Sequence, residues 1–190
     1  MSEQHEFLLK QGVAEWNRWR TENPRVRPDL ARGDFHGVNL SGANLRLADL
    51  SGANLEASDL TGADLKQAQL NDANLLRAKL LRSNLEGACL ISARLAGAEI
   101  QNANLDGAIL EQALLTGADL TGSNLSGAFA SYADLAGATL VGCDLSSADF
   151  SHANLTNANM RDAKRGNAVF DHAKLLGAVL PSSDQWAERE

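Results

Sequence analysis

The sequence predicts an all-β solenoid, and three observations lead to this fold class. Large apolar residues recur every five positions from Phe35 to Leu180, and 23 of these 30 positions are leucine. Two residues before each of them, 24 of 30 positions are alanine. Aromatic residues make up only 5% of a chain that is 44% hydrophobic. A five-residue period fits neither a long helix nor a long strand, so the chain must coil to bury these positions together.

Each five-residue unit predicts one short side and one corner. In an extended segment, residues two apart point the same way, so the alanine and the leucine point inward together. The Asp or Asn between them points outward. The next two residues are mostly Ser, Thr, Gly and Asn, which favour turns. Glycines such as Gly42 and Gly117 suit corners with a positive φ. A narrow core of leucine and alanine has no room for rings, which accounts for the low aromatic content.

Units such as ANLRL, ADLSG and ADLTG resemble the A(D/N)LXX motif of the pentapeptide repeat family over residues 33–180. The resemblance implies a right-handed quadrilateral β-helix with about 20 residues per coil and about 7.5 coils. In that register Ala130 lies beside Phe150, and a small residue beside a large one conserves core volume. A charge in such a core is costly, so we expect residues 164–167 to bulge or to expose Arg165.

The chain divides into three predicted parts. Residues 1–28 form an N-terminal α-helical cap and linker, residues 29–181 form the β-helix, and residues 182–190 form a short C-terminal cap or tail. We expect one helix over residues 3–21, ending before Pro24, whose apolar face covers the open end of the solenoid. Trp16, Trp19 and Trp186 all lie outside the repeats. The segment before the repeats also resembles cyanobacterial members of the family.

Charge and cysteine usage indicate which classes of partner and which cellular compartment the sequence favours. The formal net charge of −7 argues against a general nucleic-acid or anionic-membrane binder. No apolar run approaches the ~20 residues of a membrane span, and the N-terminus lacks a signal peptide pattern. We expect Cys89 to face outward and Cys143 inward, too far apart for a disulfide. Free thiols favour a cytoplasmic protein. We expect a protein partner, no nucleic acid and no membrane, and a monomer, with a dimer left open.

The sequence predicts no catalytic residue, no cofactor site and no metal site. It contains no clustered carboxylate pair, nucleophile–base spacing or phosphate-binding glycine loop. His152 and His172 are 20 residues apart and should be neighbours beneath Tyr132. A third metal ligand is missing, so we interpret them as a structural or solvated pair and leave a further role open.

One outward column changes from polar to apolar in the middle of the chain. Aligned exposed apolar residues are typical of a partner site, whereas drift at tolerant outer positions is the alternative. We predict that the column and its neighbours form a partner-binding surface, which consists of Cys89, Ile91, Ile109, Phe129 and Tyr132.

Three functions from different classes remain in competition. The leading hypothesis is a non-enzymatic structural or interaction protein, a rigid β-helical rod that presents a protein-binding surface. The resemblance also implies an alternative, a DNA-mimicking binder of the type II topoisomerase gyrase. Residues 95–160 support it, because they carry seven carboxylates and no Lys or Arg. The basic cluster of Arg77, Lys79, Arg82 and Arg94 counts against it. The third alternative, an enzyme with an unrecognised site, needs a concave pocket that a narrow rod rarely offers.

Overall fold

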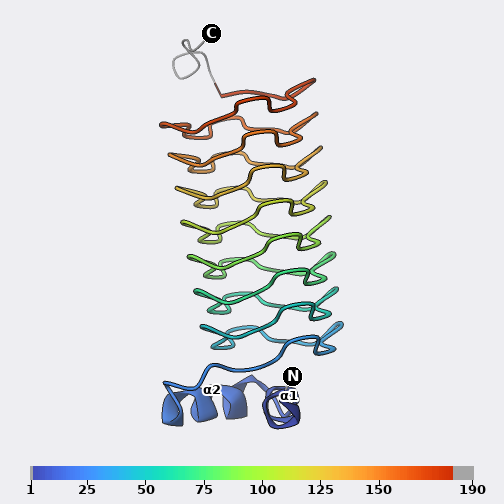
Figure 1. The fold of residues 1–190 in the computed structure, drawn as a ribbon, viewed down its shortest axis with the longest axis vertical. Helices are drawn as coiled ribbons and strands as arrows, with labels where there is room; N and C mark the ends of the chain where they lie inside the picture. Colours follow the sequence, from blue (N-terminus) through green and yellow to red (C-terminus); the bar gives the residue numbers. More distant parts are fainter. Residues whose placement is uncertain (1, 182–190) are drawn as a thin grey trace.

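Two helices precede a stack of coils in this computed structural model, which describes residues 2–181 of the 190-residue chain (Figure 1). Helix α1 spans Glu3–Lys10 and helix α2 spans Val13–Glu22. The prediction of one helix over residues 3–21 is therefore wrong. The chain turns at Gly12, whose φ of 123° is readily adopted only by a residue without a Cβ atom. No helix within residues 2–181 is long and apolar enough to cross a membrane.

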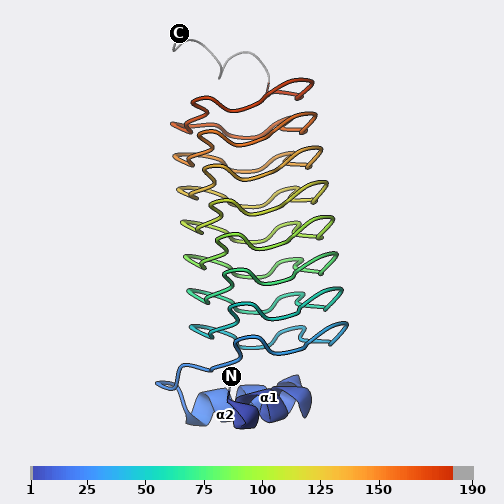
Figure 2. The ribbon, with the colours of Figure 1, turned by 45° about the vertical axis from the view of Figure 1, so that its right-hand side comes forward.

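The chain after α2 winds into coils in which each bridged residue pairs with the residue 20 positions later (Figure 2). Parallel bridges recur every five residues, from Asp29↔Asp49 to Asn159↔Val179, so each coil has four sides. Each side contributes a single bridged residue, because one corner precedes this residue and another follows it. The sequence-based register of 20 residues per coil is confirmed.

Two adjacent sides and the corner between them carry the candidate site. Side 1 holds the bridged residues 29, 49, 69, 89, 109, 129, 149 and 169, and side 2 holds 34, 54, 74, 94, 114, 134, 154 and 174. The corner between these sides contains residues 91–92, 111–112 and 131–132 in the middle coils. Residues 20 apart therefore lie side by side on neighbouring coils, at a spacing of ~4.8 Å.

Corner residues are held in the left-handed region by hydrogen bonds between coils. The φ of Gly42 is 71° and that of Tyr132 is 61°, so residues other than glycine also adopt this conformation. The N–H of Gly42 donates to the carbonyl oxygen of Thr61 on the next coil at 2.9 Å. The Asp and Asn of the motif also stabilise corners, as when Asp49 Oδ1 accepts the N–H of Ser51 at 3.0 Å. Local turn stabilisation thus explains why the motif repeats Asp and Asn.

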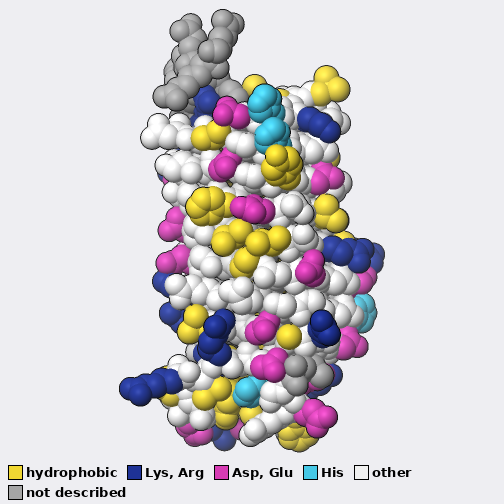
Figure 3. All heavy atoms as spheres, in the orientation of Figure 1, with side chains coloured by type: hydrophobic (Ala, Val, Ile, Leu, Met, Phe, Trp, Pro, Cys, Tyr) yellow, Lys and Arg dark blue, Asp and Glu magenta, His cyan; other side chains and the backbone are white. Residues whose placement is uncertain are grey.

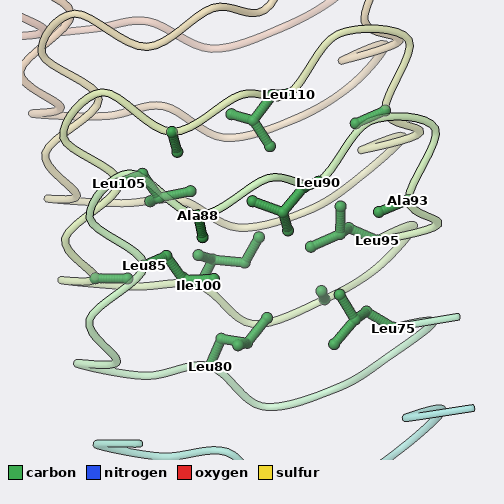
Figure 4. Packing of buried hydrophobic residues seen from close by; sticks show 14 of the residues in the cluster. Leu75, Leu80, Leu85, Ala88, Leu90, Ala93, Leu95, Ile100, Leu105 and Leu110 are labelled. Atoms are coloured by element: carbon green, nitrogen blue, oxygen red, sulfur yellow. The ribbon is translucent and has the colours of Figure 1, made fainter. Parts of the chain in front are cut away.

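The interior consists of stacked leucine and alanine side chains (Figure 4). Leu90 and Leu110, which belong to one column, are at most 1% exposed. Further along the same column Ala130 and Phe150 are both fully buried on consecutive coils. The Phe150 ring stacks on that of Phe170, with the ring centres 5.3 Å apart. The small Ala130 is therefore followed along this column by two large stacked rings.

The bridge frame continues past Arg165, but the corner after it is altered, because the positive φ lies at Gly166 (49°) and not at residue 167. The expectation that residues 164–167 bulge or expose Arg165 is therefore confirmed in part. Lys164 still bridges Asp144, and the N–H of Ala168 donates to the carbonyl oxygen of Arg165 at 2.9 Å. Arg165 is half-buried, and its guanidinium carbon lies 5.7 Å from the centre of the Phe170 ring.

Helix α2 covers the N-terminal end of the solenoid by bonding to its backbone. The buried Trp16 donates its Nε1–H to the carbonyl oxygen of Asn44 at 2.8 Å. Asn17 donates to the carbonyl oxygen of Gly42 at 3.0 Å and accepts the N–H of Asn44 at 2.8 Å. These side chains replace the bonds that a preceding coil would make. The predicted C-terminal cap or tail, with Trp186, lies outside the described residues.

Candidate protein-binding surface

Apolar side chains occupy outward positions on the middle coils, where the motif usually places Asp or Asn (Figure 3). Phe129 is 50% exposed and Tyr132 is 61% exposed. Ile109 is half-buried and bridges Phe129 on side 1. Ile91, also half-buried, lies at the corner between sides 1 and 2, two coils before Tyr132, with Glu111 and Gln112 on the coil between them. Four of the five residues predicted for the surface are therefore neighbours on the outside of the rod.

Cys89 lies at an outward position of the same column, as expected, but its thiol is buried and not part of the exposed surface. Its side chain is only 8% exposed, because it bridges Gln69 on one neighbouring coil and Ile109 on the other, and both side chains are longer. The thiol underlies the surface and adds little contact area. Cys143 faces the core as predicted, and burial raises the pKa of its thiol to about 12.

Leu114 extends the surface onto side 2 and was not among the predicted residues. It is 44% exposed and belongs to the same coil as Ile109, across the corner. Its signal in the sequence is a leucine at an outward motif position, in a column other than that of Ile109 and Phe129. The apolar patch, as used below, consists of Ile91, Ile109, Leu114, Phe129 and Tyr132.

Carboxylates lie on several sides of the apolar patch, and Arg94 lies next to Leu114 on the preceding coil. Asp106 and Glu111 are exposed and occupy the two corners that flank Ile109 on its own coil. Asp149 follows Phe129 in the column of side 1. Within residues 2–181, the ion pairs of the rod lie elsewhere on its surface. The acidic rim, as used below, consists of Asp106, Glu111, Asp134 and Asp149.

Hydrogen bonds keep Asp149 ionised. Partial burial by itself raises the pKa of this carboxyl group, but the bonds from Ser151 and Ser131 outweigh it, so the pKa is lowered. Asp149 accepts the backbone N–H of Ser151 at 2.8 Å and the Ser131 hydroxyl at 3.0 Å. Asp149 therefore carries its negative charge at neutral pH next to the exposed ring of Phe129.

A column of stacked rings continues from the patch toward the C-terminal end. The ring centres of Tyr132 and His152 are 4.7 Å apart, and those of His152 and His172 are 4.9 Å apart. The predicted neighbourhood of the two histidines beneath Tyr132 is confirmed. Among the residues that the structure describes, no group of three or more His, Cys, Asp or Glu side chains is arranged to hold a metal ion.

Comparison with known proteins identifies repeats over most of the rod. The family model for pentapeptide repeats matches in eight copies, over residues 29–67, 58–97, 93–129 and 131–164. HetL from the cyanobacterium Nostoc sp. strain PCC 7120 is described as a pentapeptide repeat protein involved in heterocyst differentiation regulation. The sequence of HetL is 36% identical to this chain, and the match covers 83% of this chain and 82% of HetL. The two structures superpose with a TM-score of 0.51.

Two other cyanobacterial structures are less similar. Rfr23 from Cyanothece 51142 is 22% identical over 86% of this chain and 97% of its own, with a TM-score of 0.35. The protein alr5209 from Nostoc PCC 7120 is 32% identical over 59% of this chain and 79% of its own, with a TM-score of 0.31. The comparison with curated proteins found no match.

Proposed function

The chain belongs to the pentapeptide repeat family, and we propose that it is a non-enzymatic interaction protein whose apolar patch binds a protein partner. Members of this family adopt a right-handed quadrilateral β-helix. The family match names no enzyme. HetL is described as involved in regulation, which suits a protein that acts by binding. We place the protein in the cytoplasm, which two cysteines without a disulfide support.

The observation that carries this proposal is the exposure of neighbouring large apolar side chains at motif positions that are mostly polar in the rest of the rod. Phe129 and Tyr132 are at least half exposed, and Leu114 is 44% exposed on the adjoining side. Contiguous exposed apolar residues with a polar surround are typical of protein interfaces, in which Phe and Tyr are enriched.

The rod holds these side chains in place before a partner arrives. Phe129 N–H donates to the carbonyl oxygen of Ala108 at 2.9 Å, and the carbonyl oxygen of Phe129 accepts the N–H of Leu110 at 2.6 Å. The backbone beneath the patch is thus bonded to the coil before it, and Ala130 bonds it to the coil after it. Binding to such a surface orders little backbone, so less of the interaction energy is lost.

Affinity capture from the native host tests this proposal. The full chain and its Phe129→Ser and Leu176→Ser variants are immobilised, and the bound proteins are identified by mass spectrometry. Leu176 is 80% exposed near the C-terminal end of the rod, outside the patch, and serves as the matched control. We expect one partner to be lost with Phe129→Ser and retained with Leu176→Ser. A partner retained equally by all three chains contradicts the proposal.

Gyrase binding by DNA mimicry is the second candidate, and the acidic stretch 95–160 is the observation that favours it. Its carboxylates are spread around the rod: Asp149 lies on side 1, Asp134 on side 2, and Glu99 bridges Asp119 on a third side. Such a distribution weighs against two continuous rows like those of DNA phosphates. A supercoiling assay at low salt tests this candidate, and protection of gyrase from its inhibitors supports it. Absence of binding and protection removes it.

A further inference from the structure

The apolar patch and the acidic rim together identify the kind of segment that fits this surface. Resting on the function proposed above, we propose that the partner supplies a basic amphipathic α-helix that lies along the rod axis on side 1. Its apolar stripe covers Ile109 and Phe129, and its flanking Lys and Arg side chains meet the acidic rim. The proposal combines the spacing of the coils with the placement of charge on both sides of one column.

The spacing of the patch matches the pitch of a helix. Ile91, Ile109 and Phe129 lie on three successive coils. Stacked coils are ~4.8 Å apart, and an α-helix advances about 5.4 Å per turn. Apolar side chains at i, i+4 and i+7 of such a helix therefore lie over successive coils for about two to three turns. In an extended strand, residues on one side recur about every 6.7 Å, so a strand along the axis falls out of step within two coils.

The charges on either side of the column select a basic helix. Asp106 and Glu111 lie at opposite corners of the coil that carries Ile109, so the apolar column runs between two exposed carboxylates. Asp149 ends the column on the C-terminal side. A helix with its apolar stripe on the column places its flanking residues over these groups, as e and g residues flank a coiled-coil seam. Arg94 is separated from this column by the corner, because it lies on side 2 beside Leu114.

Charge also disfavours a second copy of this chain as the occupant. In a two-fold symmetric dimer the same patch meets itself, which places one acidic rim against another. Residues 95–160 contain no Lys or Arg, and the four carboxylates of the rim outnumber the one guanidinium of Arg94 beside Leu114. Like charges placed opposite each other at an interface weaken association, whereas a basic partner gains both affinity and association rate.

A synthetic helix tests the proposal without the natural partner. The probe is a fluorescent peptide of leucine and lysine only, with leucine at i, i+3, i+4 and i+7, and its matched control carries glutamate in place of lysine. Binding to the full chain is measured by fluorescence anisotropy at low salt. We expect the lysine peptide to bind at least tenfold more tightly than the glutamate peptide. Phe129→Ser should weaken binding at least tenfold, and Glu111→Gln about twofold to fivefold. Leu176→Ser should leave it unchanged.

The outcomes separate this inference from the function on which it rests. The proposal of a basic helix is overturned if both peptides bind equally or if neither binds. It is also overturned if Phe129→Ser and Glu111→Gln leave the affinity unchanged. If capture from the host still depends on Phe129 in that case, the partner surface stands and only the helix is rejected. If capture is also independent of Phe129, both are rejected. If sedimentation shows a dimer and Phe129→Ser dissociates it, the patch binds a second copy of this chain and the proposal of a basic helix is overturned.

Discussion

The column containing Ala130 and Phe150 provides a quantitative test of how the coils stack. Both side chains are fully buried on consecutive coils. Ala130→Leu adds bulk against the phenylalanine and should cost about 1–3 kcal/mol. Phe150→Leu removes buried carbons and the ring contact with Phe170, and should cost about 2–3 kcal/mol. Alanine plus phenylalanine carry the same number of side-chain carbons as two leucines, so the double variant restores the filled volume.

Urea unfolding, followed by circular dichroism, gives the free energy of unfolding of the wild type, both single variants and the double variant. The double variant should be more stable than the sum of the single losses predicts, with a coupling of about 1–3 kcal/mol. The control cycle combines Ala130→Leu with Phe35→Leu, because Phe35 is also fully buried but lies in the first coils. The control should be additive. Additivity in both cycles would refute the stacking of residues 20 apart.

Three further predictions concern the cap, the thiols and acid. Asn17→Ala removes both bonds to the first coils and should lower the free energy of unfolding by about 1–3 kcal/mol; an unchanged melting temperature contradicts the capping role of α2. Cys143 and Cys89 should both resist iodoacetamide at pH 8 in the native state and react after denaturation, as mass spectrometry will show, because both are buried and the pKa of Cys143 is about 12. Hydrogen bonds from Ser146 lower the folded-state pKa of Asp144, so its stabilisation is present above the ordinary aspartate pKa of about 3.9 and is lost as the pH falls through the folded-state value. Asp144→Asn should therefore make the melting temperature less dependent on pH below about 5, and an unchanged dependence contradicts this role.

The sequence was sufficient to predict the direction of most side chains in the rod. Leucine and alanine recur in frame, and burial follows the frame even at Phe150 and at the substituted small position Cys143. This succeeds because one repeated unit specifies each side, so a local rule holds over the whole solenoid. The predicted neighbourhood of His152 and His172 follows from the same register.

Properties that depend on neighbouring side chains were not predictable from the frame. Cys89 points to the outer wall yet is buried, because its size relative to Gln69 and Ile109 determines its exposure. The break at Gly12 was missed because the apolar pattern of residues 3–21 continues across it, although a glycine disfavours a helix interior. Leu114 joins the patch only because a corner brings two different columns together.

The central claim is that a protein partner contacts the outer wall of the rod around Phe129. A photo-reactive phenylalanine analogue placed at position 129, and in a separate chain at position 176, tests this contact directly. After irradiation in host lysate, the adducts are resolved by gel electrophoresis and mass spectrometry. We predict one dominant adduct at position 129 that is absent at position 176 and is reduced by Glu111→Gln. Equal labelling at both positions, or a specific adduct at position 176 alone, would contradict it.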